Sequence, residues 1–446
     1  MRKGNVSMKD LQSIHEIEIV RLASDGTGVG YIDGKTTFVT GMLPGEKGKV
    51  KLVESKSTYQ RAEPIEISHP SSERVSPRCP VFTQCGGCSL QHMNYEHTLE
   101  WKRKWVTDTL QRIGGIQDIE VEPVIGMTKP WRYRNKAVLH RDAQGRFGYH
   151  REKTNEVVSF TDCLLLSTSM NKKIKKLQEG MGSCCSGITT ATFRQSNRGK
   201  ALVLLDGNVK NTGELEKKIK ALRQEPEFSP SVCSVSIPKG NVDYWGTGPQ
   251  FLNEHIDDIR FRVSPRAFLQ VNPEQTAKLY SLVLNFAQLT GKEELWDLYC
   301  GIGTITLVLA TRCKKVLGIE ENPHAVKDAI ENAKDNDITN VQFIQGKVED
   351  KLKAVSHIPD IVVTDPPRAG MNPLVIEKLL EIKPKKIIYV SCNPATLARD
   401  LKALTTDDGK EEGAYSIQKV QPVDMFPWTS HVESIVLMTN SGLKGK

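Results

Sequence analysis

The sequence of 446 residues contains no apolar run of about eighteen residues, the length that a membrane-spanning helix requires. Its N-terminal stretch, MRKGNVSMKDLQ, lacks the apolar core of a secretory signal peptide. These two absences predict a soluble protein of the cytoplasm that has no membrane partner. The ten cysteines would then lie in a reducing compartment, where a framework of disulfides is not expected.

The full glycine signature of dinucleotide-binding folds, G-x-G-x-x-G, is also absent. At the place where it would stand, after a predicted strand, the sequence reads DLYCGIGT from Asp297 to Thr304. An acidic residue, Glu320, ends the next predicted strand about twenty residues later. The pattern disfavours a cofactor with a pyrophosphate. It leaves room for an adenosine cofactor without phosphates, such as S-adenosylmethionine, whose ribose hydroxyls Glu320 could bind.

Charge and length set looser bounds. Lys and Arg number 61 against 53 Asp and Glu, and the net charge of +8 permits a polyanionic partner without requiring one. The chain is too long for one small core, so two or three domains are expected. We expect the protein to be monomeric.

Hydrophobic patterning predicts three domains. Residues 1–70 contain short alternating strands broken by glycine turns, typical of a small OB-like β-barrel. Such a barrel commonly grips nucleic acid, but a plain packing module fits the pattern equally well. Residues 71–265 are expected to form an α+β central domain. In residues 266–446 strands and helices alternate, which predicts an α/β fold with a doubly wound parallel sheet.

A group of cysteines marks the start of the central domain. Cys79, Cys85 and Cys88 follow the pattern C-x5-C-G-G-C, and Cys163 is a fourth candidate ligand. Thiolates at this spacing suit zinc or an iron-sulfur cluster, and the paired glycines let the backbone wrap closely. A redox pair is less well matched because no βαβ pattern surrounds the cysteines. The spacing does not separate zinc from iron and sulfur.

The central domain also carries a basic segment, Lys129–Glu156. This segment contains eight basic residues and three acidic ones, and four aromatic residues are interspersed among them: Trp131, Tyr133, Phe147 and Tyr149. We expect a β-hairpin whose cations bind phosphates and whose rings stack on unstacked bases, although the rings could equally face the core. In the preceding predicted helix, Leu99–Ile113, the basic residues Lys102–Lys104 are expected on a solvated face.

Two further segments end in polar turns. Val362–Gly370 and Ile387–Asp400 each begin as an apolar strand, so both turns should lie at the carboxyl edge of one sheet, where open α/β sheets bind ligands. Cys392 would face that site. Pro394 suits a first helical turn whose donors favour a thiolate at Cys392, and a thiolate would be a nucleophile. A small apolar filler at the strand end explains Cys392 about equally well.

Four ordered segments, DLYCGIGT, TDPPRAG, SCNPATLARD and HVESIVLM, closely resemble the RNA uracil-C5 methyltransferase family. FLQVNPEQT and the cysteine group add to the resemblance, and the N-terminal barrel resembles a TRAM domain. Barrel and cysteines together are most similar to the 23S ribosomal RNA enzymes of the RlmD and RlmCD type, since the transfer-RNA enzymes called TrmA are shorter and lack both. The resemblance implies S-adenosylmethionine-dependent formation of 5-methyluridine in 23S rRNA, with transfer RNA as the alternative substrate.

The resemblance also implies roles for single residues. Cys392 would add to uracil C6, which makes C5 nucleophilic toward the sulfonium methyl, and Glu433 would remove the C5 proton so that the thiolate can leave. The residues that would line the pocket for S-adenosylmethionine are Gln270, Tyr299, Glu320 and Asp365. The residues that would hold a [4Fe-4S] cluster, in a structural or RNA-positioning role, are Cys79, Cys85, Cys88 and Cys163.

Competing explanations exist for these residues and for the whole chain. Without the resemblance, Glu433 would be a solvated carboxylate, Asp365 a helix N-cap and Tyr299 part of the core. An amino-group methyltransferase would share D-P-P but needs no cysteine nucleophile, and a radical S-adenosylmethionine enzyme expects C-x3-C-x2-C. A non-catalytic RNA-binding iron-sulfur protein is the remaining class, and it would have no use for Cys392 and Glu433 in these settings.

Overall fold

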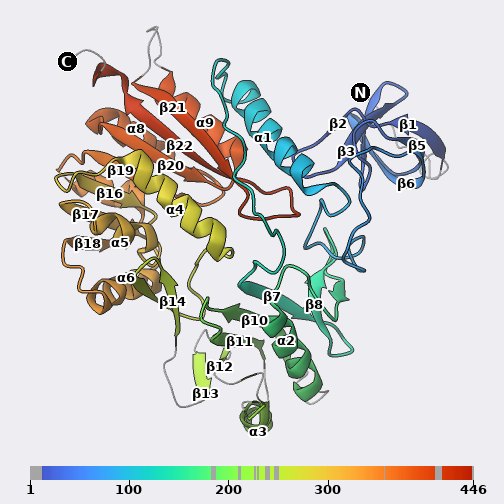
Figure 1. The fold of residues 1–446 in the computed structure, drawn as a ribbon, viewed down its shortest axis with the longest axis horizontal. Coiled ribbons are helices and arrows are strands. Elements are labelled where there is room, and N and C mark those ends of the chain that lie inside the picture. Colours follow the sequence, from blue (N-terminus) through green and yellow to red (C-terminus); the bar gives the residue numbers. More distant parts are fainter. Residues whose placement is uncertain are drawn as a thin grey trace.

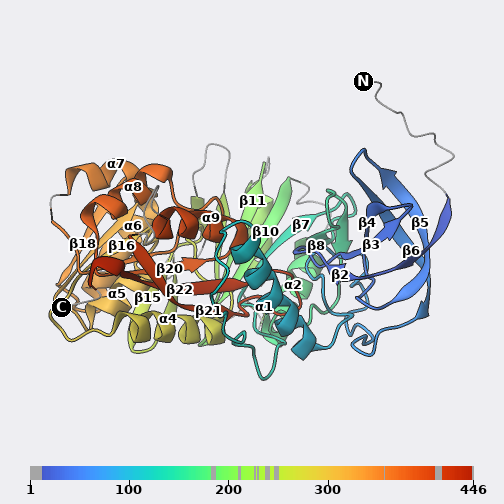
Figure 2. The ribbon, with the colours of Figure 1, turned by 90° about the horizontal axis from the view of Figure 1, so that it is seen from above.

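In a computed structural model, the chain forms three successive parts (Figure 1). The structure describes residues 13–181, 187–208, 212–222, 224–225, 228, 231–236, 242–245, 251–355, 357–406 and 414–443. A β-domain at the N-terminal end and a helix-covered sheet at the C-terminal end lie on either side of the central part (Figure 2). No helix in these ranges is both long and apolar enough to cross a membrane.

Six strands form the N-terminal β-domain and pair in the order β1-β5-β6-β4-β3-β2. They are β1 (Ile14–Glu18), β2 (Arg21–Leu22), β3 (Gly28–Ile32), β4 (Lys35–Val39), β5 (Lys47–Ser55) and β6 (Tyr59–His69). Alternation along β5 turns Val50 and Leu52 into a small core with Ile17, Val39 and Ala62, while the residues between them face outward. The predicted N-terminal β-domain is confirmed.

The central part is a seven-stranded sheet in the order β13-β12-β11-β10-β7-β8-β9. Its strands are β7 (Lys136–Arg141), β8 (Phe147–His150), β9 (Val157–Ser159), β10 (Ile188–Gln195), β11 (Ala201–Gly207), β12 (Ser231–Ser236) and β13 (Val242–Trp245). Helices α2 (Thr168–Met181) and α3 (Thr212–Leu222) pack on each other and on this sheet. The predicted α+β character is confirmed. The central strand β10 is not predicted, because the polar residues of ITTATFRQ mask its apolar alternation.

The C-terminal sheet has seven strands in the order β18-β17-β16-β19-β20-β22-β21. The parallel strands are β16 (Glu294–Leu298), β17 (Lys315–Glu320), β18 (Val341–Gln345), β19 (Ile361–Thr364) and β20 (Lys386–Ser391). An antiparallel hairpin, β21 (Tyr415–Val423) and β22 (Glu433–Asn440), closes the sheet beside β20. The predicted alternation of strands and helices is confirmed.

Helices cover both faces of this sheet (Figure 2). They are α4 (Pro273–Ala287), α5 (Thr304–Ala310), α6 (Pro323–Asp335), α7 (Val348–Lys351), α8 (Pro373–Ile382) and α9 (Pro394–Thr405). Successive strand residues enter opposite cores: Val363 and Ile388 pack with α4 to α6, whereas Val362 and Ile387 pack with α8 and α9. Near-continuous apolar strands are therefore expected, as the sequence shows.

Four helices of the C-terminal part begin with the same dipeptide, Asn-Pro. The N-caps of α4, α6, α8 and α9 are Asn272, Asn322, Asn372 and Asn393. In each case the Asn side chain accepts a backbone N–H of the first turn, and the proline fills a position that needs no donor. Helix α9 consequently starts directly after the turn that carries Cys392.

Helix α1 (Tyr95–Arg112) packs against α9 and adds Val106 and Leu110 to the core beneath it. The expected solvated face is wrong for Lys102. Its ammonium group is fully buried and donates at 2.5 Å to the equally buried carboxylate of Asp424. The Tyr95 hydroxyl donates to the same carboxylate at 2.7 Å, so the buried charges are paired.

Candidate active site

Three of the predicted site residues meet at the carboxyl edge of the parallel strands. Asp365 follows β19, Cys392 follows β20 and Glu433 opens β22. Because Ser391 of β20 lies opposite Ser434 of β22, Cys392 and Glu433 occupy neighbouring ends of two paired strands. The two polar turns therefore reach one edge of the sheet, as the sequence predicts.

Buried polar atoms mark this edge. Glu433 is 3% exposed, and its Oε2 has no hydrogen-bond partner among the described residues. The hydroxyls of Thr364 in β19 and Ser434 in β22 are buried and likewise unpartnered within that part of the chain. Folded proteins rarely leave such groups unsatisfied, so their occurrence together indicates a ligand site.

Two carboxyl groups share this poorly hydrated setting. Burial raises the pKa of Asp365 to about 7. Burial and the nearby Asp365 carboxylate raise the pKa of Glu433 to about 8, while the positive charge of Arg368 opposes the rise. The pair therefore titrates close to neutral pH, the range in which a carboxyl group works as a general base.

The state of Cys392 differs from the expectation. Burial, with the charges of Glu433 and Asp365, raises the pKa of the Cys392 thiol to about 11. The predicted thiolate is wrong for this structure, because burial and two carboxylates outweigh the donors of the first turn of α9. A reaction at this sulfur needs a proton acceptor, and the carboxyl pair offers one.

The glycine loop after β16 lies beside the end of β17. Both oxygens of Glu320 accept backbone N–H groups, from Gly301 at 3.1 Å and from Asn322 at 2.8 Å. Tyr299 has a φ of +64°, a conformation that bulky side chains rarely adopt, and its ring is half-buried. Such local strain concentrates where a backbone must present groups to a ligand. Tyr299 and Glu320 thus lie at the same sheet edge as Cys392.

Gln270 lies on the segment between β15 (Ile259–Val263) and α4 and is 7% exposed. Its carbonyl accepts a hydrogen bond at 3.3 Å from the Asn135 amide of the central part. Two residues later, the Asn272 amide donates at 3.1 Å to the carbonyl of Met425, between β21 and β22. The segment that carries Gln270 is therefore fixed from both the central part and the C-terminal hairpin.

Sequence reasoning assigns no role to three further residues, of which Asp297 and Arg368 lie near the charged groups of this edge. Asp297 in β16 is 1% exposed and accepts a hydrogen bond at 2.5 Å from the Thr306 hydroxyl, and burial raises its pKa to about 7. Arg368 is the cation that lowers the pKa of Glu433. Phe268, on the segment before α4, is 66% exposed. Only Asp297 carries a sequence signal, a lone charge inside an apolar strand.

The four candidate metal ligands lie around one cavity, here named the cysteine cavity. Residues that line it include Cys79, Cys85, Cys88, Cys163, Phe82, Gln91, Arg134, Tyr149 and Phe160. The Gly87 N–H donates to the Cys85 sulfur at 3.4 Å, and the Gln91 amide donates to the Cys88 sulfur at 3.2 Å. Burial raises the pKa of Cys88 to about 12 and of Cys163 to about 11. Buried thiols of this kind become ligands only when a metal stabilises the thiolates.

The four sulfurs surround a cavity rather than a point. In the described ranges no group of three or more His, Cys, Asp or Glu side chains is arranged to hold a single metal ion. The predicted meeting of Cys163 with the C-x5-C-G-G-C cysteines is nevertheless observed, although Cys163 lies on the far side of strands β7 to β9 in the sequence.

The predicted basic hairpin exists, but its rings do not face solvent. Strands β7 and β8 pair as expected. Tyr133 and Phe147 are buried, Trp131 stacks on Trp428, and Tyr149 stacks on Phe160. Of the two expectations for these rings, packing in the interior is confirmed and stacking on RNA bases is not, because the rings lie in the core and around the cysteine cavity.

Cations remain available on this hairpin. Arg132, Arg146, Arg151 and Lys153 each pair with an acidic residue. Lys136 pairs with none in the described chain, and it lies directly opposite Arg194 across β7 and β10. Burial, with Arg194 and Arg134, lowers the pKa of Lys136 to about 8. Like charges placed this way are unfavourable unless an anion lies between them.

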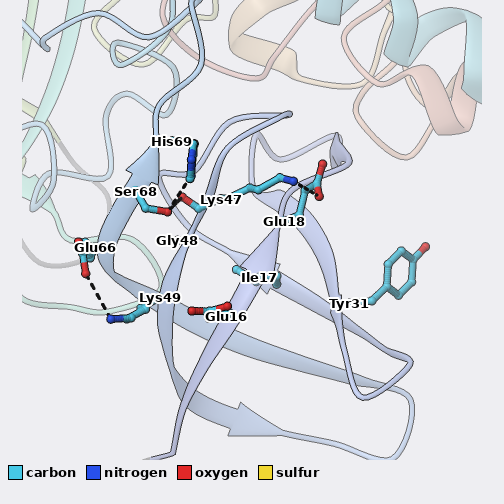
Figure 3. Close-up of a pocket in the computed structure, with 10 residues that line it drawn as sticks. All are labelled: Glu16, Ile17, Glu18, Tyr31, Lys47, Gly48, Lys49, Glu66, Ser68 and His69. Atoms are coloured by element: carbon cyan, nitrogen blue, oxygen red, sulfur yellow. Dashed lines mark hydrogen bonds and ion pairs between the residues drawn. The ribbon is translucent and has the colours of Figure 1, made fainter.

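A groove of about 500 Å³ on the N-terminal β-domain has a different character (Figure 3). Its lysines are already paired: Lys47 with Glu18 at 3.1 Å and Lys49 with Glu66 at 3.8 Å. Glu16 adds a further negative charge. This groove is therefore a poor phosphate site compared with Lys136, which has no acidic partner among the residues that the structure describes.

The fold and the site together define the class of the protein. A parallel sheet closed by an antiparallel hairpin, with a glycine loop and an acidic residue at the ends of β16 and β17, is the fold of S-adenosylmethionine-dependent methyltransferases. Residues 249–441 match the model of the tRNA (Uracil-5-)-methyltransferase family, and residues 12–65 match the TRAM domain. The chain belongs to the RNA uracil-C5 methyltransferase family and is an enzyme.

Relatives match over nearly the full length. An uncharacterized RNA methyltransferase of Halalkalibacterium halodurans is 39% identical over 448 residues, which cover 95% of this chain and 96% of the relative. One of Bacillus cereus is 39% identical over 445 residues, covering 94% and 95%. The crystal structure of Pyrococcus abyssi tRNA (uracil-54, C5)-methyltransferase in complex with S-adenosyl-L-homocysteine has a TM-score of 0.75 and 27% identity, covering 95% of this chain and 100% of that chain. Chain extent alone therefore does not separate transfer-RNA enzymes from ribosomal ones.

Proposed function

We propose that this enzyme methylates uracil C5 in 23S ribosomal RNA in the cytoplasm, with S-adenosylmethionine as the methyl donor and 5-methyluridine as the product. The observation that carries the proposal is the pairing of β20 with β22, which sets Cys392 and Glu433, whose Oε2 has no partner within the described chain, at neighbouring strand ends. C5 methylation needs a nucleophile and a base within reach of one pyrimidine ring.

The two residues act in sequence. Cys392 gives up its proton to the Asp365 carboxylate and its sulfur bonds to uracil C6, which moves the π electron pair of the C5–C6 bond into an enolate. C5 then attacks the sulfonium methyl, the methyl–sulfur bond breaks, and S-adenosylhomocysteine is the leaving group. Glu433 removes the C5 proton, the C5–C6 double bond forms again, and the Cys392 thiolate departs. The pKa of Glu433, raised to about 8, matches this base role.

The remaining site residues hold the methyl donor and the base. Gln270, Tyr299, Glu320 and Asp365 line the pocket for S-adenosylmethionine, with Glu320 at the ribose and Asp365 between the cofactor and the uracil. Support comes from the positions of Tyr299, Glu320 and Asp365 at the ends of adjacent strands. The Asp365 carboxyl, with its pKa raised to about 7, is also able to donate a hydrogen bond to uracil below neutral pH.

The cysteine cavity fits a [4Fe-4S] cluster held by Cys79, Cys85, Cys88 and Cys163. The sulfurs surround a common space, apolar side chains exclude water from it, and two N–H groups donate to sulfur. When bound, the cluster would supply a rigid cross-link between distant segments and no electron, because methyl transfer from a sulfonium is polar.

Transfer RNA is the second candidate substrate, favoured by the Pyrococcus structure that matches this chain over 95% of its length. Mass spectrometry of nucleosides from 23S rRNA and tRNA of cells lacking the protein, mapped to position, separates the two. We expect loss of 5-methyluridine from one or more 23S sites. Loss confined to tRNA would replace the substrate, and no loss in either RNA would contradict the catalytic proposal.

We expect the single-turnover rate of methylation to increase with pH. The pKa of the Cys392 thiol is raised to about 11, so the thiolate that adds to uracil C6 grows about tenfold with each pH unit below that value. Glu433 acts only after methyl transfer, so its pKa of about 8 controls release of the product and not this rate. The rate should rise about tenfold per pH unit between about pH 6 and 8. Rapid-quench assays with radiolabelled S-adenosylmethionine measure the profile. A rate that is constant or falls over this range would show that the assigned groups do not control the reaction.

Replacing Lys136 by alanine is expected to weaken RNA binding by about five- to tenfold and to reduce the salt dependence of binding by about one phosphate contact. Folding stability should not fall, because the substitution removes a repulsion with Arg194. Lys47→Ala in the groove of Figure 3 is the matched control, since Lys47 is paired with Glu18. Filter-binding titrations at several salt concentrations test both variants, and equal effects of the two would rule out this role of Lys136.

A further inference from the structure

The residues between β21 and β22, Asp424–Val432, lead directly into Glu433 and are called here the β21–β22 segment. Distant parts of the chain hold it. Lys102 of α1 binds its first residue, and the Tyr133 hydroxyl of the central part donates at 3.1 Å to the carbonyl of Pro427. The position of Glu433 therefore depends on contacts outside the C-terminal sheet.

Trp428 is the centre of the β21–β22 segment. Its φ is +68° and it is 6% exposed, so a bulky side chain is held in a conformation that needs support from its surroundings. The ring stacks on Trp131 with centroids 4.4 Å apart and planes at 25°. Its Nε1 donates at 2.7 Å to the Pro130 carbonyl. Strain supported in this way indicates a position that the fold must fix.

The two residues that follow Cys88 bind the backbone of Trp428. The backbone N–H groups of Ser89 and Leu90 both donate at 3.0 Å to the carbonyl of Trp428. In return, the Ser430 N–H donates at 3.0 Å to the Ser89 hydroxyl. Ser89 directly follows Cys88, so three hydrogen bonds join a wall of the cysteine cavity to the residues before Glu433.

Packing joins the two features as well. One apolar cluster contains Trp428 together with Met127, Tyr133 and Leu165, and both Cys88 and Cys163 pack against it. Two of the four cysteines thus touch the cluster that supports the strained tryptophan. A shift of these sulfurs has to be absorbed by the cluster, because close-packed interiors transmit displacement.

We propose that Trp428 is a positioning residue that couples the contents of the cysteine cavity to the placement of the base Glu433. A filled cavity holds Cys88 and Ser89, Ser89 holds the backbone at Trp428, and Trp428 holds the segment that ends at Glu433. The inference rests on the proposed function for the role of Glu433, but the mechanical coupling does not. Proton abstraction is the step most sensitive to it, since a misplacement of about 1 Å can cost about a hundredfold in rate.

Hydrogen exchange tests the coupling without any catalytic readout. Anaerobically prepared protein that retains iron and sulfide is compared with the same protein after oxidative removal of iron with ferricyanide and chelator. We expect faster exchange in residues 79–91 and, together with it, in residues 426–434, while residues 415–421 at the far end of β21 stay protected. Faster exchange in residues 79–91 alone would overturn the coupling.

A single substitution tests the step that is affected. Ser89→Ala removes the acceptor for the Ser430 N–H and leaves every cysteine in place, so its iron content should equal that of the wild type. We expect release of the covalent enzyme–RNA adduct to slow by about ten- to a hundredfold, with methyl transfer changed by less than about threefold. Ser416→Ala, which loses a hydroxyl contact with Ser441 at the other end of the hairpin, is the matched control.

The outcomes remain distinct from a failure of the proposed function. If no RNA is methylated at uracil, the adduct assay gives no signal and the exchange experiment alone decides the coupling. If RNA is methylated but Ser89→Ala and Ser416→Ala release the adduct at equal rates, the link from Ser89 to Glu433 is wrong while the function stands. If the isolated protein holds no iron, the comparison of these two variants decides the link through Trp428.

Discussion

Replacing Cys392 by alanine is expected to lower the rate of RNA methylation by about 10⁴-fold or more and to abolish every covalent enzyme–RNA adduct. Uracil C5 is too weak a nucleophile to take the sulfonium methyl until sulfur has added at C6. The side chain of Cys392 is the thiol at the end of β20, between the turns that carry Asp365 and Glu433. Single-turnover assays with radiolabelled S-adenosylmethionine, followed by denaturing gels, measure both effects.

Cys313→Ala is the matched control for this substitution. Cys313 is also a free thiol and is buried, but it precedes β17 and therefore lies at the opposite edge of the sheet. We expect normal methylation by this variant, and normal binding of S-adenosylmethionine by Cys392→Ala. Full methylation by Cys392→Ala would instead favour an amino-group methyltransferase, which needs no thiol.

The C-terminal fold could be predicted closely because its local signals agree with one another. The strands are apolar on both sides, as Val362 and Val363 show by packing into opposite cores. The helices begin at Asn-Pro, where the side chain caps the first turn and proline fixes the entry. Strand length, cap and turn all indicate the same topology. The alternation of strands and helices along the sequence was therefore enough to predict that Asp365 and Cys392 lie at one sheet edge.

The central part was harder because tertiary contacts override its local pattern. Lys102 has the sequence signature of a solvated cation, yet Asp424, more than three hundred residues later, buries it. Trp131 and Tyr133 alternate with arginines as in a nucleic-acid surface. In the structure, however, the Trp131 ring stacks on Trp428, and the Tyr133 hydroxyl donates a hydrogen bond to the Pro427 carbonyl. A local sequence pattern cannot predict a contact with a residue that is so distant in the sequence.

The electrostatics of the site could not be predicted either. The first turn of α9 does favour a thiolate at Cys392, but its effect is local and modest. Burial and the charges of Glu433 and Asp365 act in the opposite direction and dominate. Glu433 is the first residue of β22 and follows Cys392 by 41 residues in the sequence. Its charge can therefore disfavour a thiolate at Cys392 only because β22 pairs with β20.

Replacing Glu433 by glutamine is expected to trap the enzyme on its RNA. The amide cannot take the C5 proton, so methyl transfer should proceed once and the methylated, covalently bound intermediate should accumulate, with product release slowed by about 10²- to 10⁴-fold. Folding should be preserved or improved above neutral pH, because the substitution removes a buried carboxyl whose pKa burial has raised to about 8. Denaturing gels with radiolabelled methyl groups show the adduct directly.

Two further variants separate this role from its alternatives. Glu377→Gln, on the exposed side of α8, should behave as the wild type, which excludes a general effect of lost charge. Asp365→Asn should weaken substrate binding and slow methyl transfer without leaving a methylated adduct, because Asp365 is assigned to the pocket and not to the C5 proton. An adduct that accumulates in Asp365→Asn but not in Glu433→Gln would exchange the roles of the two carboxyls. The pKa values of the pair allow either assignment. Both β19 and β22 pair with β20, but the register differs: Ser434 lies opposite Ser391, which sets Glu433 level with Cys392, whereas Thr364, the residue before Asp365, lies opposite Tyr389. This difference in register is the reason for choosing Glu433.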